Sequence, residues 1–237
     1  MTLKWSIGLM TGTVNDGYID IAALRTDGTE IFEFGPCELS AYKDQSIKEL
    51  IFKTYEEARK WNFEGPEPNI FSLTEKKITE EQSAAVEEFI NRYKLKKNEI
   101  SCVGFHGLTV LHRPVDLNNN VGKTRQLGSG QMMSDYLQLP VVNNFRSNDI
   151  DNGGQGAPLA PIYHLALAKY IKEQNVVFLN IGGVSNITYI GNTDKLIALD
   201  CGPGNAPIDD FVRYHNKGSM DRDGKFAKLG NVNHDLV

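Results

Sequence analysis

The segment IGLMTGTVNDGYIDIAAL, residues 7–24, decides the fold, because two apolar runs flank a loop of glycine and small polar residues. A tight hairpin needs only about two turn residues, usually of Asn-Gly type. This interruption is longer, and it carries hydroxyl groups and a carboxylate that would bury almost no apolar surface. We therefore predict two strands joined by a loop that binds a ligand.

Apolar patterning beyond this segment predicts an α/β protein with two lobes. The first predicted elements are strands at 5–10, 18–25 and 30–34, which form an antiparallel meander, and helices at 44–61 and 81–93. Further strands alternate with helices along the rest of the chain, without a low-complexity linker. We expect a first lobe over residues 1–128 and a second lobe over residues 129–237.

Composition argues against several classes of function. The 237 residues are 41% hydrophobic and 23% charged, as in a globular protein with a sizeable core. A net charge of −5 without a Lys/Arg cluster argues against a nucleic-acid partner. Cys37, Cys102 and Cys201 form no Cys-x-x-Cys pair, which favours neither a disulfide framework nor a zinc site. The apolar stretch 5–10 is too short for a signal peptide or a membrane span, so we expect a cytoplasmic protein without a membrane partner.

Three segments share one design, in which a strand predicted to be buried runs into glycine and small polar residues. They are IGLMTGT (7–13), LNIGGVSN (179–186) and LDCGPGN (199–205). Backbone amides at such turns can converge on an anion such as phosphate, although none of the three is a P-loop or a dinucleotide fingerprint. One such loop is more often an ordinary turn, whereas three favour a phosphate-binding cleft between the lobes. The predicted phosphate-binding residues, which the resemblance described next assigns to ATP, are Gly12, Thr13, Asp16, Gly17, Gly182, Gly183, Gly202, Gly204 and Asn205.

Further motifs carry a resemblance to a known family. They are GFHGLTVLHRP (104–114), QLGSGQ (126–131), LPVVNNFRSNDIDNGGQGAPLAP (139–161), LNIGGVSNITY (179–189), DCGPGNAPIDDF (200–211) and DRDG (221–224). In this order, behind GLMTGTVNDG, they resemble the anhydro-N-acetylmuramic acid kinases over residues 7 to about 233. The resemblance implies a two-lobed actin/hexokinase/Hsp70-like sugar kinase fold with an incomplete second lobe. It also implies ATP and Mg²⁺ as cofactors and a small anhydrosugar as substrate, while the metal ligands and a homodimer are left open.

The chemistry that the resemblance implies is hydrolytic opening of a 1,6-anhydro sugar coupled to phosphorylation of O6, in recycling of cell-wall sugar. In the family, the aspartate of a Phe-Arg-x-x-Asp motif is the general base for the attacking water, and it falls here on Asp149. The freed O6 then attacks the γ-phosphate of ATP. From the residues alone, Asp149 has an alternative role as a cap of the turn into the glycine loop.

The predicted substrate-binding residues are His106, Arg146 and Gln155. Arg146 either clamps a substrate carboxylate, such as a lactyl group, or ties its loop down through Asp151. A histidine after a buried strand is more often a core residue, but the resemblance favours sugar contact for His106. Asn205 also suits the N-cap of the helix that follows it.

Several positions depart from the family's pattern and keep two alternatives open. Polar or charged residues of the family are replaced here by Val14, Leu108, Ser129, Asn144 and Cys201. These changes allow a kinase for a different sugar or anhydrosugar, or a non-catalytic nucleotide- or sugar-binding paralogue. Chains of the family also continue past the segment that matches GNVNHDLV, so we expect a fragment or a degenerate paralogue with apolar surface exposed on its second lobe.

Overall fold

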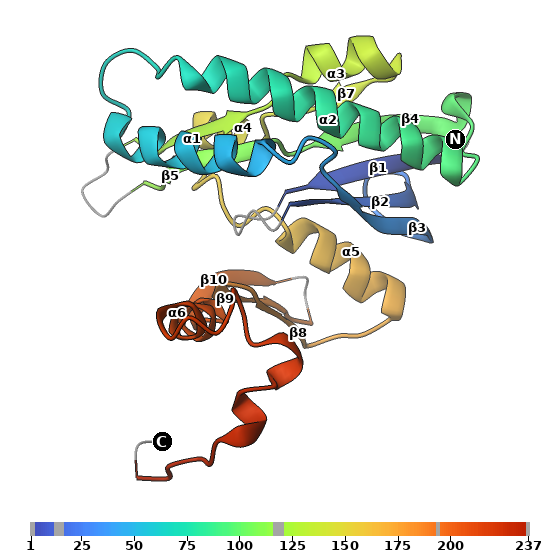
Figure 1. Ribbon diagram of the computed structural model, residues 1–237. Helices are drawn as coiled ribbons and strands as arrows, with labels where there is room; N and C mark the ends of the chain where they lie inside the picture. Colours follow the sequence, from blue (N-terminus) through green and yellow to red (C-terminus); the bar gives the residue numbers. More distant parts are fainter. Residues whose placement is uncertain (1–2, 12–16, 116–120, 193–194, 236–237) are drawn as a thin grey trace.

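The computed structural model describes residues 3–11, 17–115, 121–192 and 195–235 (Figure 1). Its first lobe is built on a five-stranded sheet with the strand order β3-β2-β1-β4-β7. The strands are β1 (Lys4–Met10), β2 (Tyr18–Thr26), β3 (Ile31–Ala41), β4 (Ile100–Phe105) and β7 (Val141–Val142). The first three form an antiparallel meander, while β4 runs parallel to β1 and β7 runs parallel to β4. The predicted opening meander is confirmed.

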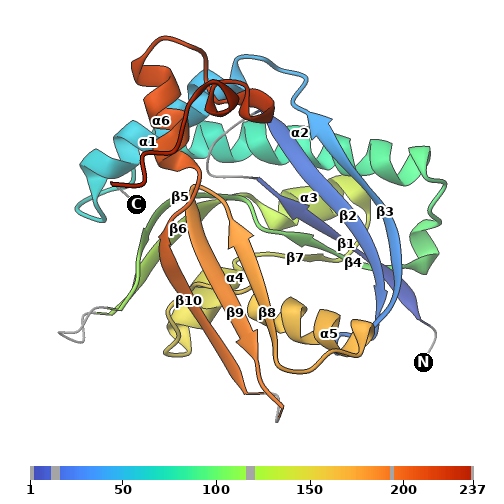
Figure 2. The same cartoon turned by 90° about the horizontal axis from the view of Figure 1, so that it is seen from below.

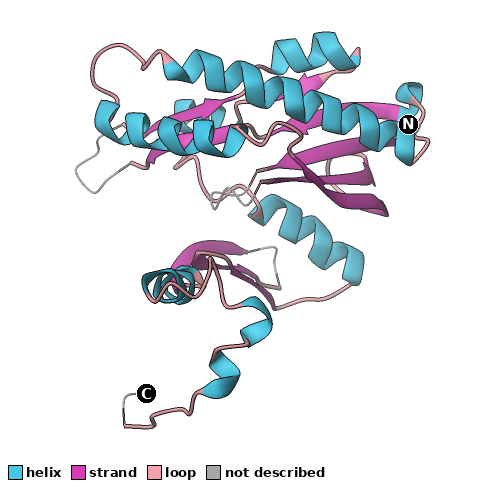
Figure 3. Cartoon of the chain, in the orientation of Figure 1, coloured by secondary structure: helices cyan, strands magenta, loops and turns pink. Residues whose placement is uncertain are grey.

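Two helices cover one face of this sheet and close the main core (Figure 3). They are α1 (Ile47–Trp61) and α2 (Ile70–Arg92). The core lies between them and the sheet, and its fully buried side chains include Ile7, Ile47 and Phe89. Helix α2 begins well before the predicted residue 81. Its first half buries Thr74 and Thr79, so the apolar periodicity that marks a helix is missing there.

The last elements of the first lobe surround the end of the sheet. They are the short helix η1 (Lys97–Glu99), the ribbon of β5 (Leu108–Arg113) with β6 (Lys123–Leu127), and helices α3 (Gly130–Leu137) and α4 (Phe145–Asp151). Helix α3 contacts α2, and β7 joins the first sheet, although both lie after the boundary predicted at residue 128. We propose that the lobes divide after α4.

The second lobe repeats the opening order of the first, a three-stranded antiparallel meander followed by a helix (Figure 2). Its elements are β8 (Val176–Ile181), β9 (Val184–Ile190), β10 (Leu196–Pro203), α6 (Ala206–Tyr214), η2 (Arg222–Gly224) and η3 (Ala227–Leu229). Helix α5 (Pro161–Ile171) lies between the lobes and contacts β3 on one side and β9 and β10 on the other (Figure 1). The predicted two-lobed α/β fold is therefore confirmed.

One face of the second sheet is apolar and exposed. Strand register places Val177 and Leu179 of β8 beside Tyr189 and Ile187 of β9, and these side chains share a face because alternate residues point the same way. Leu179 is 58% exposed and Ile181 is 62% exposed. The expected apolar surface on the second lobe is present, whereas the prediction that β8 and β10 are buried strands is wrong.

We expect this face to drive self-association of the 237-residue chain, because large exposed apolar patches tend to pair with one another. Sedimentation velocity over a range of concentrations should show a rising mean mass. Leu179→Lys should shift the distribution toward monomer, since it places a charge in the middle of the patch. A chain that stays monomeric at every concentration would contradict this expectation.

A buried amide holds both ends of the segment between β1 and β2. Gln82 Nε2 in α2 donates to Thr11 Oγ1 at 2.7 Å and to the Tyr42 hydroxyl at 2.9 Å. The backbone N–H of Tyr42 donates in turn to the carbonyl of Gly17 at 3.1 Å. One side chain on α2 therefore links the residue before the loop to the residue after it.

Replacing Gln82 with leucine should lower the free energy of unfolding by about 1–3 kcal/mol, because two buried hydroxyl groups lose a hydrogen-bond donor. Urea denaturation measures the change. Gln131→Leu is the matched control, since Gln131 is an exposed helix residue whose amide donates only to Asp135 of its own helix. The Gln131 variant should stay within about 0.5 kcal/mol of the parent chain. Equal stability of the two variants would show that the Gln82 contacts contribute little.

Candidate active site

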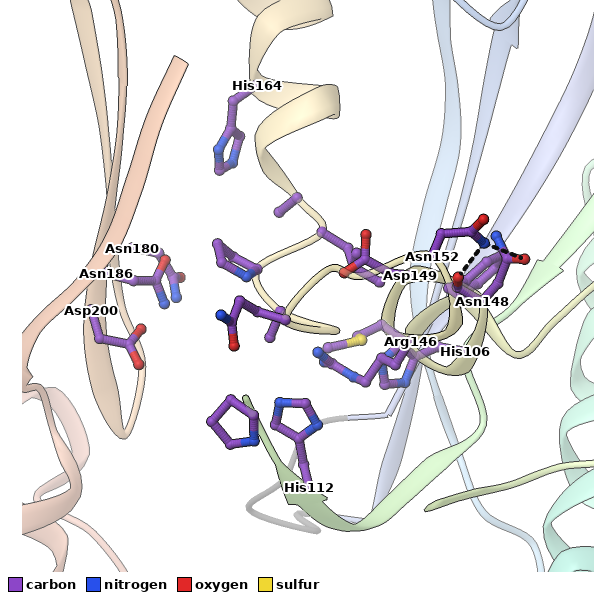
Figure 4. Close-up of a pocket in the computed structure, with 18 residues that line it drawn as sticks. His106, His112, Arg146, Asn148, Asp149, Asn152, His164, Asn180, Asn186 and Asp200 are labelled. Carbon is purple, nitrogen blue, oxygen red and sulfur yellow. Dashed lines mark hydrogen bonds between the residues drawn. The ribbon is translucent and has the colours of Figure 1, made fainter. Parts of the chain in front are cut away.

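A cavity of about 1260 Å³ lies between the two lobes (Figure 4). Its first-lobe wall comes from β5, α4 and the loop after α4, and its second-lobe wall comes from the three strands of the second sheet. The polar residues that line it are His106, His112, Arg146, Asn148, Asp149, Asn152, Gln155, His164, Asn180, Asn186 and Asp200. The cavity therefore brings together all three predicted substrate-binding residues and the predicted catalytic base.

Asp149 is held by the glycine loop that follows α4. Its Oδ2 accepts a hydrogen bond from the Gly156 N–H at 2.7 Å, and its carbonyl accepts one from the Gly154 N–H at 2.8 Å. A Cβ atom at Gly154 would lie 2.2 Å from Asp149 Oδ2, so this close approach requires glycine. Oδ1 accepts no hydrogen bond from the described residues. Asp149 thus caps the turn, as the alternative reading expected, and keeps one oxygen for a ligand.

Arg146 has a backbone partner and, among the described residues, no carboxylate partner. Its Nη1 donates to the carbonyl of Gly156 at 2.8 Å, and burial lowers the pKa of its guanidinium. Among the residues described here, no carboxylate lies within ion-pair distance of Arg146. Asp151 lies apart from it and lines a separate pocket beside Trp61 and Phe63. The alternative tie between Arg146 and Asp151 is not formed.

Two histidines of the first lobe point nitrogen atoms at the cavity (Figure 4). His106 Nδ1 lies 2.9 Å from the carbonyl of Gly107, so Nδ1 carries the hydrogen and Nε2 is left as an acceptor. Burial lowers the pKa of His106, and the charge of Arg146 lowers it further. Burial also lowers the pKa of His112, with added effects of Arg146 and Arg113. His112 was not predicted as a site residue, although it stands in the motif GFHGLTVLHRP (104–114).

The second-lobe wall presents a row of oxygen-bearing side chains. Strand register places Asn186 of β9 directly between Asn180 of β8 and Asp200 of β10. Neighbouring residues on one face of a sheet have Cβ atoms about 5 Å apart, so the three side chains can contact one ligand. Figure 4 shows them facing the cavity. Asn180 and Asn186 were also missed, because their alignment depends on strand register.

The two glycine turns of the second lobe are joined to each other. Asn205 N–H donates to the Gly182 carbonyl at 2.8 Å, and Gly204 N–H donates to the Gly183 carbonyl at 2.9 Å. These four residues and Gly202 follow the cavity-lining row along their strands but do not line the cavity themselves. The Asn205 side chain makes no capping hydrogen bond to α6, contrary to expectation.

The first glycine loop is described only at its end. Gly17 begins the second half of the opening hairpin with φ +92°, a conformation that favours glycine. The predicted residues Gly12, Thr13 and Asp16, and the replaced position Val14, lie outside the described residues.

Four of the replaced family positions lie outside the cavity lining. Leu108 is 1% exposed and belongs to the core. Ser129 Oγ accepts a hydrogen bond from Met132 N at 3.2 Å and caps α3, a role that aspartate fills equally well. Asn144 starts α4 with φ 58°, a left-handed conformation that Asn and Asp both tolerate. Cys201 is exposed on β10. None of these four residues lines the cavity.

Comparison with known proteins assigns the chain to a family. A family model described as anhydro-N-acetylmuramic acid kinase matches residues 4–237. The chain belongs to the anhydro-N-acetylmuramic acid kinase family. Curated anhydro-N-acetylmuramic acid kinases are similar to it over most of its length: that of Brucella anthropi is 50% identical over 98% of the chain, and that of Rhizobium rhizogenes is 48% identical over 96%. The chain spans 62% and 61% of the length of these two relatives.

Two further features of the described residues concern metal binding and membrane spans. Within the described ranges, no group of three or more His, Cys, Asp and Glu side chains is placed to hold a metal ion. The row on the second-lobe wall consists of one carboxylate, Asp200, and two amides, Asn180 and Asn186. No helix among the described residues has the length and apolar character needed to cross a bilayer.

We expect acid to destabilise this kinase-family chain as the pH falls below about 6.5, before most carboxylates titrate. A histidine whose pKa is lowered in the folded state binds fewer protons there than in the unfolded state. Its contribution to stability is therefore complete above the unfolded pKa of 6.5 and is lost as the pH falls toward the folded value.

His106→Gln should flatten the fall in Tm between pH 7.5 and 5.5, because it removes the more buried of the two first-lobe histidines. Thermal unfolding followed by circular dichroism measures the slope. His234→Gln, at an exposed position near the C-terminal end, serves as the control and should keep the parent slope. Parallel curves for His106→Gln and the parent chain would refute the assignment.

Proposed function

We propose that the whole protein is a cytoplasmic kinase that opens 1,6-anhydro-N-acetylmuramic acid with water and transfers a phosphoryl group from ATP to O6. The product is N-acetylmuramic acid 6-phosphate, in cell-wall sugar recycling. Family membership supports this activity. The observation that carries it is Asp149, anchored through Oδ2 and turned toward a cavity of about 1260 Å³ between two lobes.

Asp149 is the proposed general base. Its contact with the Gly156 N–H fixes the carboxylate, and Oδ1 takes a proton from the water that attacks the anomeric carbon. The bond between that carbon and O6 breaks, and O6 takes the electron pair and attacks the γ-phosphorus. ADP leaves with the electron pair of the broken phosphoanhydride bond. Water supplies the new anomeric hydroxyl, so atoms and charges balance.

The glycine turns and the row on the second-lobe wall are proposed to hold the nucleotide. Asp200, Asn180 and Asn186 offer one carboxylate and two amide oxygens, which are hard ligands that suit Mg²⁺. Such an ion would neutralise charge on the transferred phosphoryl group. The backbone N–H groups around Gly182, Gly183 and Gly202 are proposed phosphate donors, together with Gly12, Thr13, Asp16 and Gly17.

A substrate panel tests the function. The complete product of the gene that encodes this chain is mixed with Mg-ATP and either 1,6-anhydro-N-acetylmuramic acid, other anhydrosugars or free hexoses, and ADP release is measured. We expect turnover with the muramic acid derivative above all others. Preference for another sugar would favour the second reading, and nucleotide binding without turnover would favour a binding protein. The replaced positions that motivated those readings, apart from Val14, do not line the cavity.

A further inference from the structure

One buried amide lies behind the first-lobe wall of the cavity. Gln126 stands on β6, is 4% exposed and does not line the cavity. Its Nε2 donates to the carbonyl of His106 at 2.8 Å, and its Oε1 accepts from the backbone N–H of Arg146 at 3.4 Å. A carbonyl can only accept and an N–H can only donate, so both contacts fix the same orientation of the amide. Gln126 therefore joins two segments of the cavity wall that lie on either side of it in the sequence.

Gln126 supplies an N-terminal cap that α4 otherwise lacks. The first N–H groups of a helix have no acceptor inside the helix. Asn144, which precedes α4, has φ 58° and makes no side-chain capping hydrogen bond. None of the seven residues of α4 is buried. So short a helix gains its order from contacts with the rest of the protein, and the Gln126 side chain is such a contact at its first turn.

The two ends of α4 are held in different ways. At its end, the Gly156 N–H donates to Asp149 Oδ2 at 2.7 Å, and the Gly156 carbonyl accepts from Arg146 Nη1 at 2.8 Å. Gly156 belongs to the loop that continues α4, so these contacts hold the loop to the helix. Gln126 belongs to β6, whose next residue, Leu127, is fully buried in the first-lobe core. The Gln126 contact therefore fixes α4 relative to that core.

Asp149 lies close to the point that Gln126 holds. It follows Arg146 by three residues, which is less than one turn of helix. A shift of the start of α4 would therefore move the Asp149 carboxylate as well. A general base works only within hydrogen-bond reach of its proton, and a misplacement of about 1 Å can lower a rate by about 10²-fold.

We propose that Gln126 is a positioning residue for the reaction, which sets the place of Asp149 by holding the start of α4 against the connection between β4 and β5. The inference rests on the proposed function, because Asp149 is the base of that reaction. Gln126 does not line the cavity, so it acts through α4 and not by contact with the sugar. It stands in the motif QLGSGQ (126–131), but no role was predicted for it from the sequence.

Gln126→Met tests the proposal, because methionine has nearly the length of glutamine and neither a strong donor nor a strong acceptor. The complete gene product is assayed with saturating Mg-ATP and 1,6-anhydro-N-acetylmuramic acid. We expect kcat to fall by about 10–100-fold. The Kd for ATP, measured by calorimetry, should change by less than about twofold, since the proposed nucleotide site lies on the other wall of the cavity.

A double-mutant cycle separates positioning from a general loss of stability. In the Asp149→Asn background, Gln126→Met should change kcat by less than about twofold, because no base is left to misplace. A loss that arises from weakened folding would be the same in both backgrounds. Thr54→Val is the matched control, since it removes a buried hydroxyl that lies 2.7 Å from Thr74 Oγ1, between α1 and α2 and away from the cavity lining. It should lower the Tm and keep the parent kcat.

Hydrogen exchange gives a readout that does not depend on activity. Exchange in the peptide that covers α4 should quicken by about tenfold in Gln126→Met and stay unchanged in Thr54→Val. Gln126→Glu keeps an acceptor for the Arg146 N–H and loses the donor to the His106 carbonyl, so its exchange should stay closer to that of the parent. If the methionine variant does not fold, the glutamate variant carries the test, and its smaller loss of kcat should likewise vanish in the Asp149→Asn background.

Three results would overturn the inference: an unchanged kcat in a folded Gln126→Met variant, equal losses with and without Asp149, or unchanged exchange in α4. The proposed function fails separately, if the parent protein shows no turnover of 1,6-anhydro-N-acetylmuramic acid. In that case faster exchange in Gln126→Met would still support the hold of Gln126 on α4. Turnover by the parent together with an indifferent Gln126→Met would refute the positioning role alone.

Discussion

Asp149→Asn is expected to lower kcat by about 10²–10⁴-fold and to leave the affinities for ATP and sugar nearly unchanged. Asparagine keeps the shape of the side chain, and its Oδ1 can still accept the Gly156 N–H that now bonds to the carboxylate at 2.7 Å. Only the basicity is lost. The loss should therefore appear in kcat, measured in steady state with the complete gene product, Mg-ATP and the anhydrosugar.

Two further variants separate catalysis from capping. Asp149→Ala removes both the base and the contact with Gly156, so it should also lower the Tm, which Asp149→Asn should not. Asp151→Asn is the matched control two residues along the same helix, at a carboxylate that lines a different pocket. It should keep the parent kcat. If Asp151→Asn abolishes turnover and Asp149→Asn does not, the base has been assigned to the wrong residue.

Gly204→Ala should pull apart the two glycine turns of the second lobe. A Cβ atom there would lie 2.0 Å from the Gly182 carbonyl oxygen. This oxygen belongs to the backbone, so it cannot move aside as the end of a flexible side chain could. The hydrogen bonds from Gly204 and Asn205 to the other turn would break. At about 1 kcal/mol each, their loss should cost about 2 kcal/mol or more of local stability.

Hydrogen exchange followed by mass spectrometry reads this effect locally. Exchange should quicken by about 30-fold at the amides of Gly204 and Asn205, since each 1.4 kcal/mol is a factor of ten. Gly8→Ala is the control, because a Cβ atom at that strand position meets nothing within 4 Å. It should leave those amides protected. Unchanged protection in Gly204→Ala would mean that the joined turns are looser than the contacts indicate.

Sequence patterns predicted those parts of the fold that interactions between residues close in sequence determine. The opening meander could be predicted because its apolar residues alternate with others along the strand. In β1, Ile7 and Leu9 are buried while their neighbours are not. The first half of α2 was not predicted because Thr74 and Thr79 satisfy their hydroxyl groups inside the core, through partners that a single sequence does not reveal. Exposure of β8 and β10 depends on what packs against them, which strand composition does not specify.

The candidate site was also predicted only in part. Asp149, Arg146 and His106 were predicted because they belong to contiguous motifs that carry the family resemblance, and the cavity does contain them. His112 has its ring placed by Gly156, which lies far along the chain, and the row of Asn180, Asn186 and Asp200 exists only through strand register. Leu108 and Ser129 were interpreted as residues near the cleft, but Leu108 is a core side chain and Ser129 caps a helix.

Isotope placement during a single turnover tests the central claim most directly, namely that water activated by Asp149 opens the ring while O6 takes the phosphoryl group. The complete gene product is mixed with Mg-ATP and 1,6-anhydro-N-acetylmuramic acid in ¹⁸O-labelled water, and the first-formed product is analysed by mass spectrometry. The account predicts one ¹⁸O atom on the anomeric carbon of N-acetylmuramic acid 6-phosphate and none in its phosphate. Labelled inorganic phosphate with an intact anhydro ring would contradict it.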